Sequence, residues 1–270
     1  NTILVDSTAG NILATRYNHI LSAGISVVTP NKVANSENYE VYKSIRDAAI
    51  KGNAEFRYET NVGAALPIIE TLRDLINNGD ELIQIEGVLS GTLSYIFNSL
   101  KEGKKFSDVV KDAKARGFTE PDPRDDLSGL DIARKLLILI RESGKEYELS
   151  DIEIDNLVPK ELREINNINT FLKELSKYDN EFEDMRIKAE SNNKVLSYMA
   201  KYKNGKATVK IEEIDSEHPF YSLKGIDNIV SFRTNYYNEI PLVIKGPGAG
   251  PEFTASGVLS DILKIANSKG

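Results

Sequence analysis

The sequence predicts an α/β protein, and two patterns carry that prediction. In the first sixty residues, short apolar runs alternate with segments whose apolar residues recur at helical spacing, which is typical of parallel βαβ units. Residues 194–244 instead alternate apolar and polar side chains with period two, which indicates β-strands. Within that stretch, Asn204-Gly205 separates two alternating runs and predicts a two-residue hairpin turn.

The elements follow in order from these periodicities and from the glycines and prolines that interrupt them. We expect residues 157–188 to be helical in pieces, and Pro121 and Pro123 predict a rigid loop without regular helix over 119–126. The remaining predicted elements are strand 3–5, helix 11–23, strand 25–28, helix 38–51, strand 55–59, helix 64–77, strand 82–88, helices 92–102, 106–116 and 127–142, strands 195–202, 207–211, 229–234 and 242–245, and helix 254–266.

Composition excludes several classes of function. The chain has 270 residues, with 41 Asp+Glu against 34 Lys+Arg and a net charge of −7, so we expect no nucleic-acid partner. Apolar runs are too short for a membrane span, and we expect no membrane partner. Cysteine is absent and only two histidines occur, which excludes disulfides and thiolate chemistry and leaves proton transfer to Lys, Asp, Glu or Tyr. The absence of cysteine fits a reducing compartment, and we expect a cytoplasmic protein.

The densest group of chemically useful side chains lies in residues 117–135, where five carboxylates fall within twelve residues. The two prolines restrict where those carboxylates can point. Asp131 and Lys135 are four residues apart on a predicted helix, so they share one face. A lysine held beside a carboxylate in a partly dry site can serve as a proton donor. The alternative is an acidic surface loop followed by an exposed ion pair worth a few tenths of a kcal/mol.

Three other stretches could bind a ligand. Lys32 follows the predicted strand 25–28, and ligands of open α/β sheets bind beyond the carboxyl ends of strands. Glu59 precedes a turn at Gly63, where converging carbonyls could bind a hard cation. The glycine-rich residues 246–250 precede the last helix and suit close approach of a phosphate or cofactor. Each could equally be an ordinary loop with nothing bound, and the chain contains neither G-x-G-x-x-G nor a P-loop.

Taken together, these stretches resemble homoserine dehydrogenase. They occur in the order found in that family and cover nearly the whole chain, and the nineteen-residue segment 117–135 is the most specific of them. Residues 149–159 and 236–250 are most similar to the dehydrogenase part of bifunctional aspartokinase–homoserine dehydrogenase. The segments that match the family are VDSTAG at 5–10, TPNK at 29–32, ETNVGAALP at 59–67, GVLSGTLSYIFN at 87–98, GFTEPDPRDDLSGLDIARK at 117–135 and GPGAG at 246–250.

The resemblance implies an α/β (α+β) fold with two domains. Residues 1–61 and 246–270 would form an incomplete Rossmann-type nucleotide-binding domain that lacks its G-x-G-x-x-G half. Residues 62–245 would form a mixed-sheet catalytic and dimerisation domain with helices on one face, and a homodimer would form through that sheet. Because the chain opens at Asn1 directly on a predicted strand, we expect it to be part of a longer polypeptide and, by itself, to bind dinucleotide very poorly and to be inactive.

The resemblance also implies a reaction, the NAD(P)-dependent interconversion of L-aspartate 4-semialdehyde and L-homoserine in the synthesis of threonine, methionine and isoleucine. By motif position, Lys135 would be the general acid toward the carbonyl oxygen, and Asp131 would orient it or the substrate. Lys32 would lie near both the substrate and the nicotinamide and share the proton chemistry.

The remaining site residues are implied in the same way. Glu120 and Asp126 would hold the substrate ammonium, a pairing that also follows from the charges. Phe118 stands where tyrosine is usual in the family, so no hydroxyl role carries over to it. Thr92 and Phe118 would line the substrate pocket; the cofactor residues would be Thr8, Lys32, Gly117, Glu120 and Gly248; a monovalent cation such as sodium would bind Glu59 and the carbonyls of Val62, Ala64 and Leu66.

Two other functions remain open from the sequence. The chain could be a non-catalytic dimerisation or regulatory piece of the bifunctional protein. Alternatively, the carboxylates of Asp122, Asp125 and Asp126 could hold Mg²⁺ for phosphoryl transfer, although the lack of a P-loop or another phosphate-cradling loop weighs against that reading.

Overall fold

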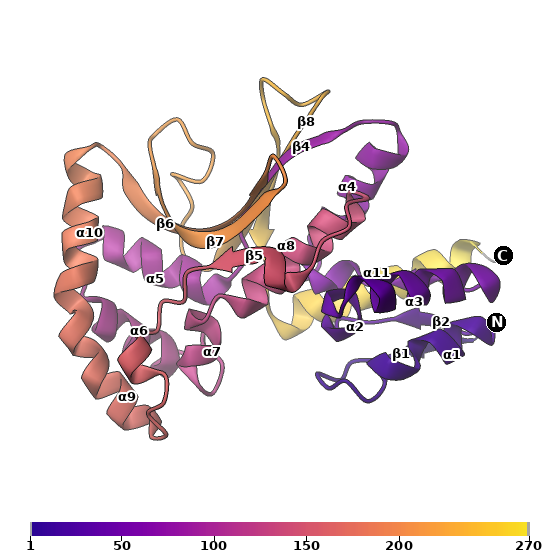
Figure 1. Cartoon of the computed structure of the whole chain (residues 1–270), viewed down its shortest axis with the longest axis horizontal. Coiled ribbons are helices and arrows are strands. Elements are labelled where there is room, and N and C mark those ends of the chain that lie inside the picture. The colour runs from indigo at the N-terminus through magenta and orange to yellow at the C-terminus, as the bar shows by residue number, and fades with distance from the viewer. Residues whose placement is uncertain (1, 269–270) are drawn as a thin grey trace.

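Residues 2–268 are described by a computed structural model that contains two β-sheets (Figure 1). The smaller sheet has three parallel strands in the order β1-β2-β3. The larger has six strands in the order β5-β7-β6-β4-β8-β9, antiparallel except for the β5–β7 pair. The strands are β1 Ile3–Val5, β2 Ser26–Val28, β3 Phe56–Arg57, β4 Leu82–Val88, β5 Ile152–Ile154, β6 Val195–Lys203, β7 Lys206–Ile214, β8 Asp227–Thr234 and β9 Leu242–Pro247. The predicted α/β class with a parallel and a mixed sheet is confirmed.

The helices fall into two sets that follow the two sheets. The α-helices before residue 62 connect the parallel strands, and several of the others pack on the larger sheet. The α-helices are α1 Tyr17–Ser22, α2 Val33–Ser36, α3 Tyr39–Lys51, α4 Ile68–Asn77, α5 Gly91–Lys101, α6 Phe106–Ala115, α7 Pro123–Leu127, α8 Leu130–Glu142, α9 Ile168–Glu174, α10 Asp179–Ser191 and α11 Pro251–Ser268. The 3-10 turns are η1 Ala14–Arg16, η2 Glu59–Asn61, η3 Leu149–Asp151, η4 Lys160–Leu162 and η5 Leu175–Tyr178.

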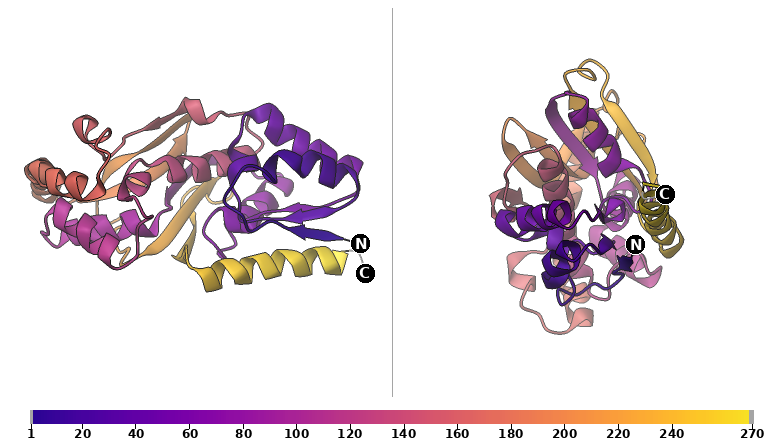
Figure 2. Two further views of the ribbon diagram at one scale, coloured as in Figure 1. Left: turned by 90° about the horizontal axis from the view of Figure 1, so that it is seen from below. Right: turned by 90° about the vertical axis from the view of Figure 1, so that its right-hand side faces the viewer.

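The small sheet has its own hydrophobic core. Its central strand β2 is buried throughout, and α1 packs against α3. Tyr17, Leu21, Val27 and Ile45 are at most 1% exposed and form the centre of that core. Helix α11 returns to this sheet, where it contacts β2 and η2, and Figures 1 and 2 show both ends of the chain at this end of the molecule.

The six-stranded sheet is covered by helices on one face, as predicted (Figure 1). Helix α8 lies centrally there, in contact with β5, β6 and β7, and α5 and α10 pack beside it. Its apolar residues Leu136 to Ile140 are all fully buried, so α8 is a structural centre of the larger core. Over the opposite face, Phe220 and Leu223 of the β7–β8 connection pack on the sheet.

The predicted hairpin is confirmed. Strands β6 and β7 pair in register up to Lys203 and Lys206, with Asn204 and Gly205 as the two turn residues. Both have positive φ, 52° and 76°, which is the backbone of a type I′ turn. Strand β7 continues to Ile214, beyond the predicted end at residue 211.

The prediction that 119–126 contains no helix is wrong, because α7 begins at Pro123. Proline is tolerated at the first position of a helix, where its missing N–H needs no partner. The carboxylate of Asp122 caps this helix by accepting the backbone N–H of Arg124 at 3.0 Å. The prolines therefore start a helix here and do not exclude one.

The predicted helix 127–142 is divided into two. Helix α7 ends at Leu127 and α8 starts at Leu130, because Gly129 between them has a φ of +74°. A side chain at Gly129 would also collide with the hydroxyl of Tyr198, so glycine is required there on two grounds. The acidic residues of α7 and those of α8 therefore belong to two separate helices.

Three further predictions need correction, and one strand was missed. The predicted helix 64–77 begins only at Ile68, because Ala64 has a φ of +53°. The predicted helix 11–23 begins with the 3-10 turn at Ala14. The predicted strand 55–59 is confined to Phe56 and Arg57, because Glu59 already starts a 3-10 turn. Strand β5 was not predicted, since three residues interrupted by Glu153 give too little periodicity.

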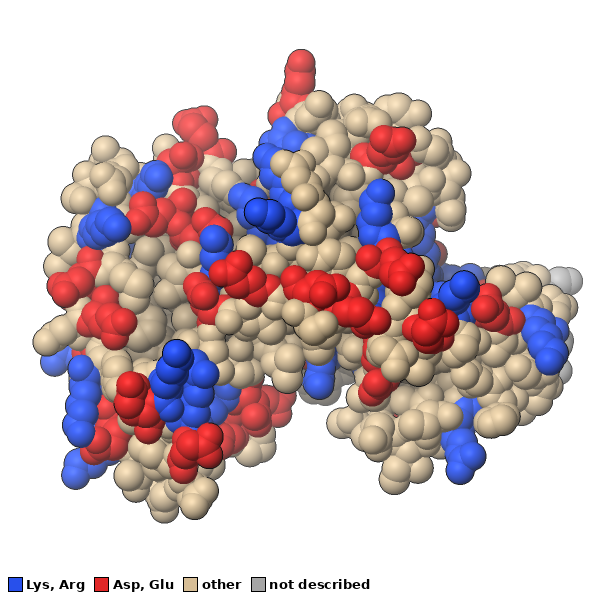
Figure 3. Space-filling model, in the orientation of Figure 1, with Lys and Arg blue, Asp and Glu red and all other residues tan. Residues whose placement is uncertain are grey.

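The molecular surface agrees with the acidic composition. On the face drawn in Figure 3, acidic side chains run across the middle and are mixed with basic ones, without a broad basic area. Within residues 2–268, no helix combines the length and apolar character that crossing a membrane requires.

The two constraints at Gly129 can be separated by substitution. Gly144→Ala places a side chain at positive φ in open space and should cost about 1–2 kcal/mol of unfolding free energy. Gly129→Ala adds the collision with Tyr198 and should cost about 2–5 kcal/mol. Urea unfolding of both variants measures the difference; equal losses would contradict the steric explanation.

Candidate active site

A cleft of about 510 Å³ is lined by residues at strand ends of both sheets and by the starts of α5 and α8. Its volume is within the range of small-molecule sites. The residues after β2 and after β4 both reach it, as expected for the carboxyl ends of strands. The predicted site residues that line it are Lys32, Ala64, Thr92, Gly117, Phe118, Glu120, Asp126, Asp131, Lys135 and Gly248.

Asp131 lies between two lysines in this cleft. One carboxylate oxygen is 2.8 Å from Nζ of Lys135, and the other is 3.4 Å from Nζ of Lys32. The Lys135 side chain is only 12% exposed, and its Nζ also donates to the carbonyl of Leu89 at 2.8 Å. Two of its three donors are thus used by these protein groups, and one is left for a molecule in the cleft. The pair is therefore part of a recessed site and not an exposed surface ion pair.

Burial and charge act in opposite directions on these groups. Burial alone would raise the pKa of the Asp131 carboxyl, but the adjacent Lys135 and Lys32 ammonium groups outweigh it and hold that pKa below its ordinary value. Burial lowers the pKa of the Lys32 ammonium, and the charge of Asp131 offsets only part of that effect. Asp131 remains anionic at neutral pH, and Lys32 gives up its proton more readily than an exposed lysine does.

Asp126, in the first turn of α7, holds the carboxylate-rich loop together. One of its oxygens accepts the hydroxyl of Thr92 at 2.8 Å, and the other accepts the backbone N–H of Glu120 at 2.8 Å. Burial raises the pKa of its carboxyl. The carboxylate keeps free lone pairs for a donor in the cleft, and the exposed Glu120 is the second carboxylate lining this part of it.

An aromatic side chain, Phe118, lines the cleft beside these carboxylates. The ring of Phe118 lies edge-on against Tyr95, with 5.1 Å between the ring centroids. The hydroxyl of Tyr95 donates to Asp112, and this hydrogen bond holds the ring of Tyr95 in place behind Phe118. Phe118 thus supplies apolar surface beside the carboxylates.

The glycine-rich loop offers backbone for a cofactor. Gly248, Ala249 and Gly250 line the cleft directly before α11, an 18-residue helix whose N-terminus favours anions. No side chain fits at Gly248, because its Cβ would overlap the amide of Asn228. The buried hydroxyl of Thr60, another lining residue, has no partner within the described chain. These features fit a dinucleotide that approaches the backbone closely.

Thr8 is placed differently from the other predicted cofactor residues. It is exposed in the loop after β1, outside the cleft lining, and its backbone N–H donates to Asp6 at 2.9 Å. That loop is joined to the loop after β2 because Nδ2 of Asn31 donates to the carbonyl of Gly10 at 2.7 Å. Thr8 therefore lies on a loop held next to the cleft.

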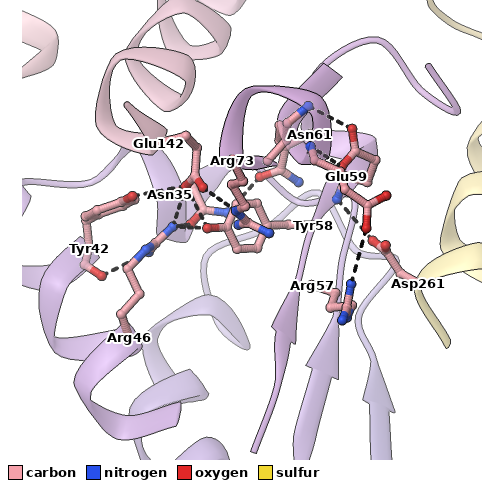
Figure 4. Close-up of polar contacts among 12 residues, drawn as sticks. Asn35, Tyr42, Arg46, Arg57, Tyr58, Glu59, Asn61, Arg73, Glu142 and Asp261 are labelled. Carbon is pink, nitrogen blue, oxygen red and sulfur yellow. Dashed lines mark hydrogen bonds and ion pairs between the residues drawn. The ribbon is translucent and has the colours of Figure 1, made fainter. Parts of the chain in front are cut away.

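Glu59 lies behind the cleft, where its carboxylate accepts the N–H groups of Ile69 at 2.8 Å and Glu70 at 2.9 Å at the start of α4 (Figure 4). Asp261 of α11 approaches from the other side and accepts the backbone N–H of Glu59 at 3.0 Å. Burial, with a smaller contribution from the Asp261 charge, raises the pKa of Glu59 to about 7. Of the proposed carbonyl ligands, that of Leu66 accepts the N–H of Ile68 at 2.8 Å.

Two of the three carboxylates considered for Mg²⁺, those of Asp122 and Asp126, have protein partners. Both oxygens of Asp122 bind the guanidinium of Arg124, with Nε at 3.0 and 3.1 Å. Across residues 2–268, no three acidic, histidine or cysteine side chains come together in a metal-binding group.

Sequence reasoning missed several lining residues. The carbonyl of Leu89, which orients Lys135, acts through backbone, and no side-chain pattern marks such a role. Ile226 reaches the cleft from a distant loop, so only the tertiary fold could place it. Thr60 was detectable in principle, since it follows Glu59 in a stretch already singled out.

Comparison with known proteins assigns the family. Residues 67–263 match the family model for homoserine dehydrogenase, and residues 1–59 match the model for the homoserine dehydrogenase NAD-binding domain. The chain belongs to the homoserine dehydrogenase family. The predicted resemblance is thereby confirmed, and the cleft with its two lysines lies in a homoserine dehydrogenase fold.

Two relatives illustrate the range of homoserine dehydrogenases that the chain resembles. It is 48% identical to the homoserine dehydrogenase of Schizosaccharomyces pombe over 97% of its own length and 72% of the relative's. It is 47% identical to the chloroplastic bifunctional aspartokinase/homoserine dehydrogenase 2 of Arabidopsis thaliana over its whole length. The chain spans about 30% of that bifunctional relative.

Solved structures agree with this assignment. A Candida auris protein of unknown function superposes with a TM-score of 0.96 at 46% identity, covering 98% of this chain and 76% of that one. A hyperthermophilic archaeal homoserine dehydrogenase in complex with NADPH superposes with a TM-score of 0.75 at 30% identity, covering 98% and 72%.

The environment of Glu59 predicts a measurable pH dependence. Because its folded pKa, about 7, exceeds the ordinary value of 4.5, the folded state binds a proton that the unfolded state releases between these values. The contribution of Glu59 to stability is thus lost as pH rises from about 4.5 to 7. In buffer without sodium or another small monovalent cation, Glu59→Gln should remove this component, so the unfolding free energy of the variant falls less over that range, by about 2–3 kcal/mol. Identical slopes for the two proteins would contradict the raised pKa.

Proposed function

We propose that the protein carrying this chain is an NAD(P)-dependent homoserine dehydrogenase that interconverts L-aspartate 4-semialdehyde and L-homoserine. The observation that carries the proposal is the Lys32–Asp131–Lys135 group in the cleft of a chain of this family. Nicotinamide, when bound, supplies the hydride to the aldehyde carbon or takes it back. The aldehyde oxygen gains a proton in reduction, and the alcohol loses one in oxidation.

Lys135 is suited to supply that proton. Asp131 and the Leu89 carbonyl fix the direction of its ammonium group, and its remaining donor is available to the aldehyde oxygen. Lys32 faces the same carboxylate from the small sheet, where the cofactor would lie, and its lowered pKa suits it to exchange protons beside the reaction. Asp131 stays ionised and orients both lysines.

Substrate binding follows from charge. The ammonium of the amino-acid substrate would lie between Glu120 and Asp126, whose carboxylates border the cleft. Thr92 holds Asp126 in place, and Phe118 packs against the carbon chain of the substrate. The carboxylates would thus hold the substrate, and the backbone of residues 248–250 would hold the cofactor beside it.

The cofactor, NADP or NAD, would be bound by Lys32, Gly117, Glu120 and Gly248, with Thr8 on the adjacent loop. A monovalent cation such as sodium would bind Glu59 with the carbonyls of Val62, Ala64 and Leu66. The raised pKa of Glu59 supports this, because a bound cation would stabilise its charged form. That ion would have a structural or activating role.

The proposal extends to organisation and context. Residues 1–61 and 246–270 would form the nucleotide-binding domain, since α11 packs on β2 and η2 of the small sheet. Residues 62–245 would form the catalytic domain and pair in a homodimer through the six-stranded sheet. The enzyme would serve the cytoplasmic synthesis of threonine, methionine and isoleucine.

Replacing Lys135 tests the catalytic assignment. In the full natural polypeptide that carries this chain, Lys135→Ala should lower kcat about 10²- to 10⁴-fold, because the proton donor is removed, with little change in KM. Homoserine-dependent NADP reduction measures this, and Lys188→Ala, an exposed lysine of α10, is the matched control. Activity near wild type would favour the non-catalytic dimerisation or regulatory role.

The role of Asp131 predicts a shift in pH dependence. Asp131 raises the pKa of Lys32 against the effect of burial, so Asp131→Asn should let that pKa fall further. If protonated Lys32 is required, the basic limb of the kcat profile moves to lower pH in the variant. An unchanged basic limb would remove Lys32 from the proton chemistry.

A further inference from the structure

Helix α8 and the start of α2 hold the Lys32–Asp131–Lys135 group of the cleft, and the two helices meet at two separate places. Lys32 directly precedes α2, and Asp131 and Lys135 lie in the first turns of α8. Lys135 shares a helix with Asp131, so their 2.8 Å contact is local to α8. The 3.4 Å contact from Lys32 to Asp131 instead depends on how α2 docks against α8.

The second meeting place is Arg141, near the far end of α8. Its side chain is completely buried. Nη1 donates to the carbonyl of Asn35 at 3.0 Å and to that of Glu37 at 2.6 Å, at the end of α2. Nε donates to the carbonyl of Tyr147 at 3.0 Å, and Nη2 binds the carboxylate of Glu148 at 3.0 Å. A buried guanidinium therefore receives its partners chiefly from the end of α2 and from residues 147–148.

Glu148 extends this anchor to the start of α3. Its other oxygen accepts the backbone N–H of Tyr39 at 2.8 Å, at the first residue of that helix. The rings of Tyr39 and Tyr42 face the guanidinium of Arg141, at 5.7 and 5.1 Å. Arg141 thus holds the junction where α2 ends and α3 begins.

The next residue, Glu142, fixes the same end of α8 (Figure 4). Its side chain is 5% exposed, and its carboxylate accepts the hydroxyls of Tyr42 at 3.0 Å and Tyr58 at 2.7 Å. It also accepts N–H groups of Arg46 at 3.0 Å and Arg73 at 2.6 Å. Because α3, α4 and the residue after β3 all bind this one carboxylate, the end of α8 cannot shift independently of them.

We propose that Arg141 is a positioning residue for Lys32: by binding the last carbonyls of α2, it keeps α2 docked so that Lys32 reaches Asp131. Lys135 does not depend on this contact, because it reaches Asp131 within α8 itself. Loss of Arg141 should therefore change Lys32 and leave Lys135 unaffected. The kinetic consequence rests on the proposed function, whereas the contact between Lys32 and Asp131 does not.

Competitive acylation of lysines tests the contact without any activity. In Arg141→Met of the full natural polypeptide, trace labelling with acetic anhydride should acylate Lys32 at least about fivefold faster relative to exposed Lys188, because the amine loses its carboxylate partner. The rate at Lys135 should change less than about twofold. Arg186→Met, which breaks ion pairs within α10, is the matched control and should leave both rates unchanged.

Kinetics separate positioning from mere stability. Arg141→Met should lower kcat about tenfold per folded molecule, with KM values within about twofold, because a misplaced proton-transfer group slows the chemical step. Arg141→Lys should recover part of kcat, since lysine keeps the positive charge but lacks the planar guanidinium that binds several carbonyls at once. A lowered melting temperature with wild-type kcat and wild-type Lys32 acylation would overturn the proposal.

The proposal can still be tested if Arg141→Met does not fold or if the wild-type protein is inactive. If Arg141→Met does not fold, Glu148→Gln weakens the same anchor and should raise Lys32 acylation by a smaller factor; no rise overturns the proposal. If the wild-type protein shows no homoserine oxidation, the proposed function fails, and Lys32 acylation alone still decides whether Arg141 positions that lysine.

Discussion

The burial of α8 is the constraint on which the rest of the structure depends. Its residues from Leu136 to Ile140 are fully buried, so the helix lies inside the larger core with the six-stranded sheet on one side. A helix packed at this density cannot rotate or slide without opening voids. The charged groups near its two ends are therefore held in fixed places, Asp131 and Lys135 at the cleft and Arg141 and Glu142 at the junction with the small sheet.

The charged groups at the two ends of α8 differ in their exposure and in their hydrogen-bond partners. At the cleft, Asp131 is half exposed and accepts two lysines, an arrangement that leaves room for a substrate. At the junction, Glu142 and Arg141 are buried, and every side-chain nitrogen of Arg141 and both carboxylate oxygens of Glu142 bind protein groups. Buried charges are tolerated only when fully paired, so the junction is built for a fixed geometry and the cleft for exchange of ligands.

The composition of the chain and the chemistry of the cleft agree. With no cysteine and two histidines in the sequence, the acid–base groups that line the cleft are lysines and carboxylates. Carboxylates on a loop braced by Asp126 suit an ammonium, and lysines beside Asp131 suit a carbonyl oxygen. Glycine-rich backbone at the start of α11 suits an anionic cofactor. The cleft thus has one side that suits the proposed substrate and another that suits the proposed cofactor.

The sequence by itself determined the α/β class, most helices, the Asn204-Gly205 hairpin and many of the residues that line the cleft, because periodicity, turn chemistry and motif spacing are local properties. Tertiary structure decided what local signals do not contain. It ended α7 before α8 because Gly129 packs against Tyr198, and it assigned the Leu89 carbonyl to Lys135. It also placed Arg141 against α2, since a contact across 104 residues of sequence arises only when both segments are packed.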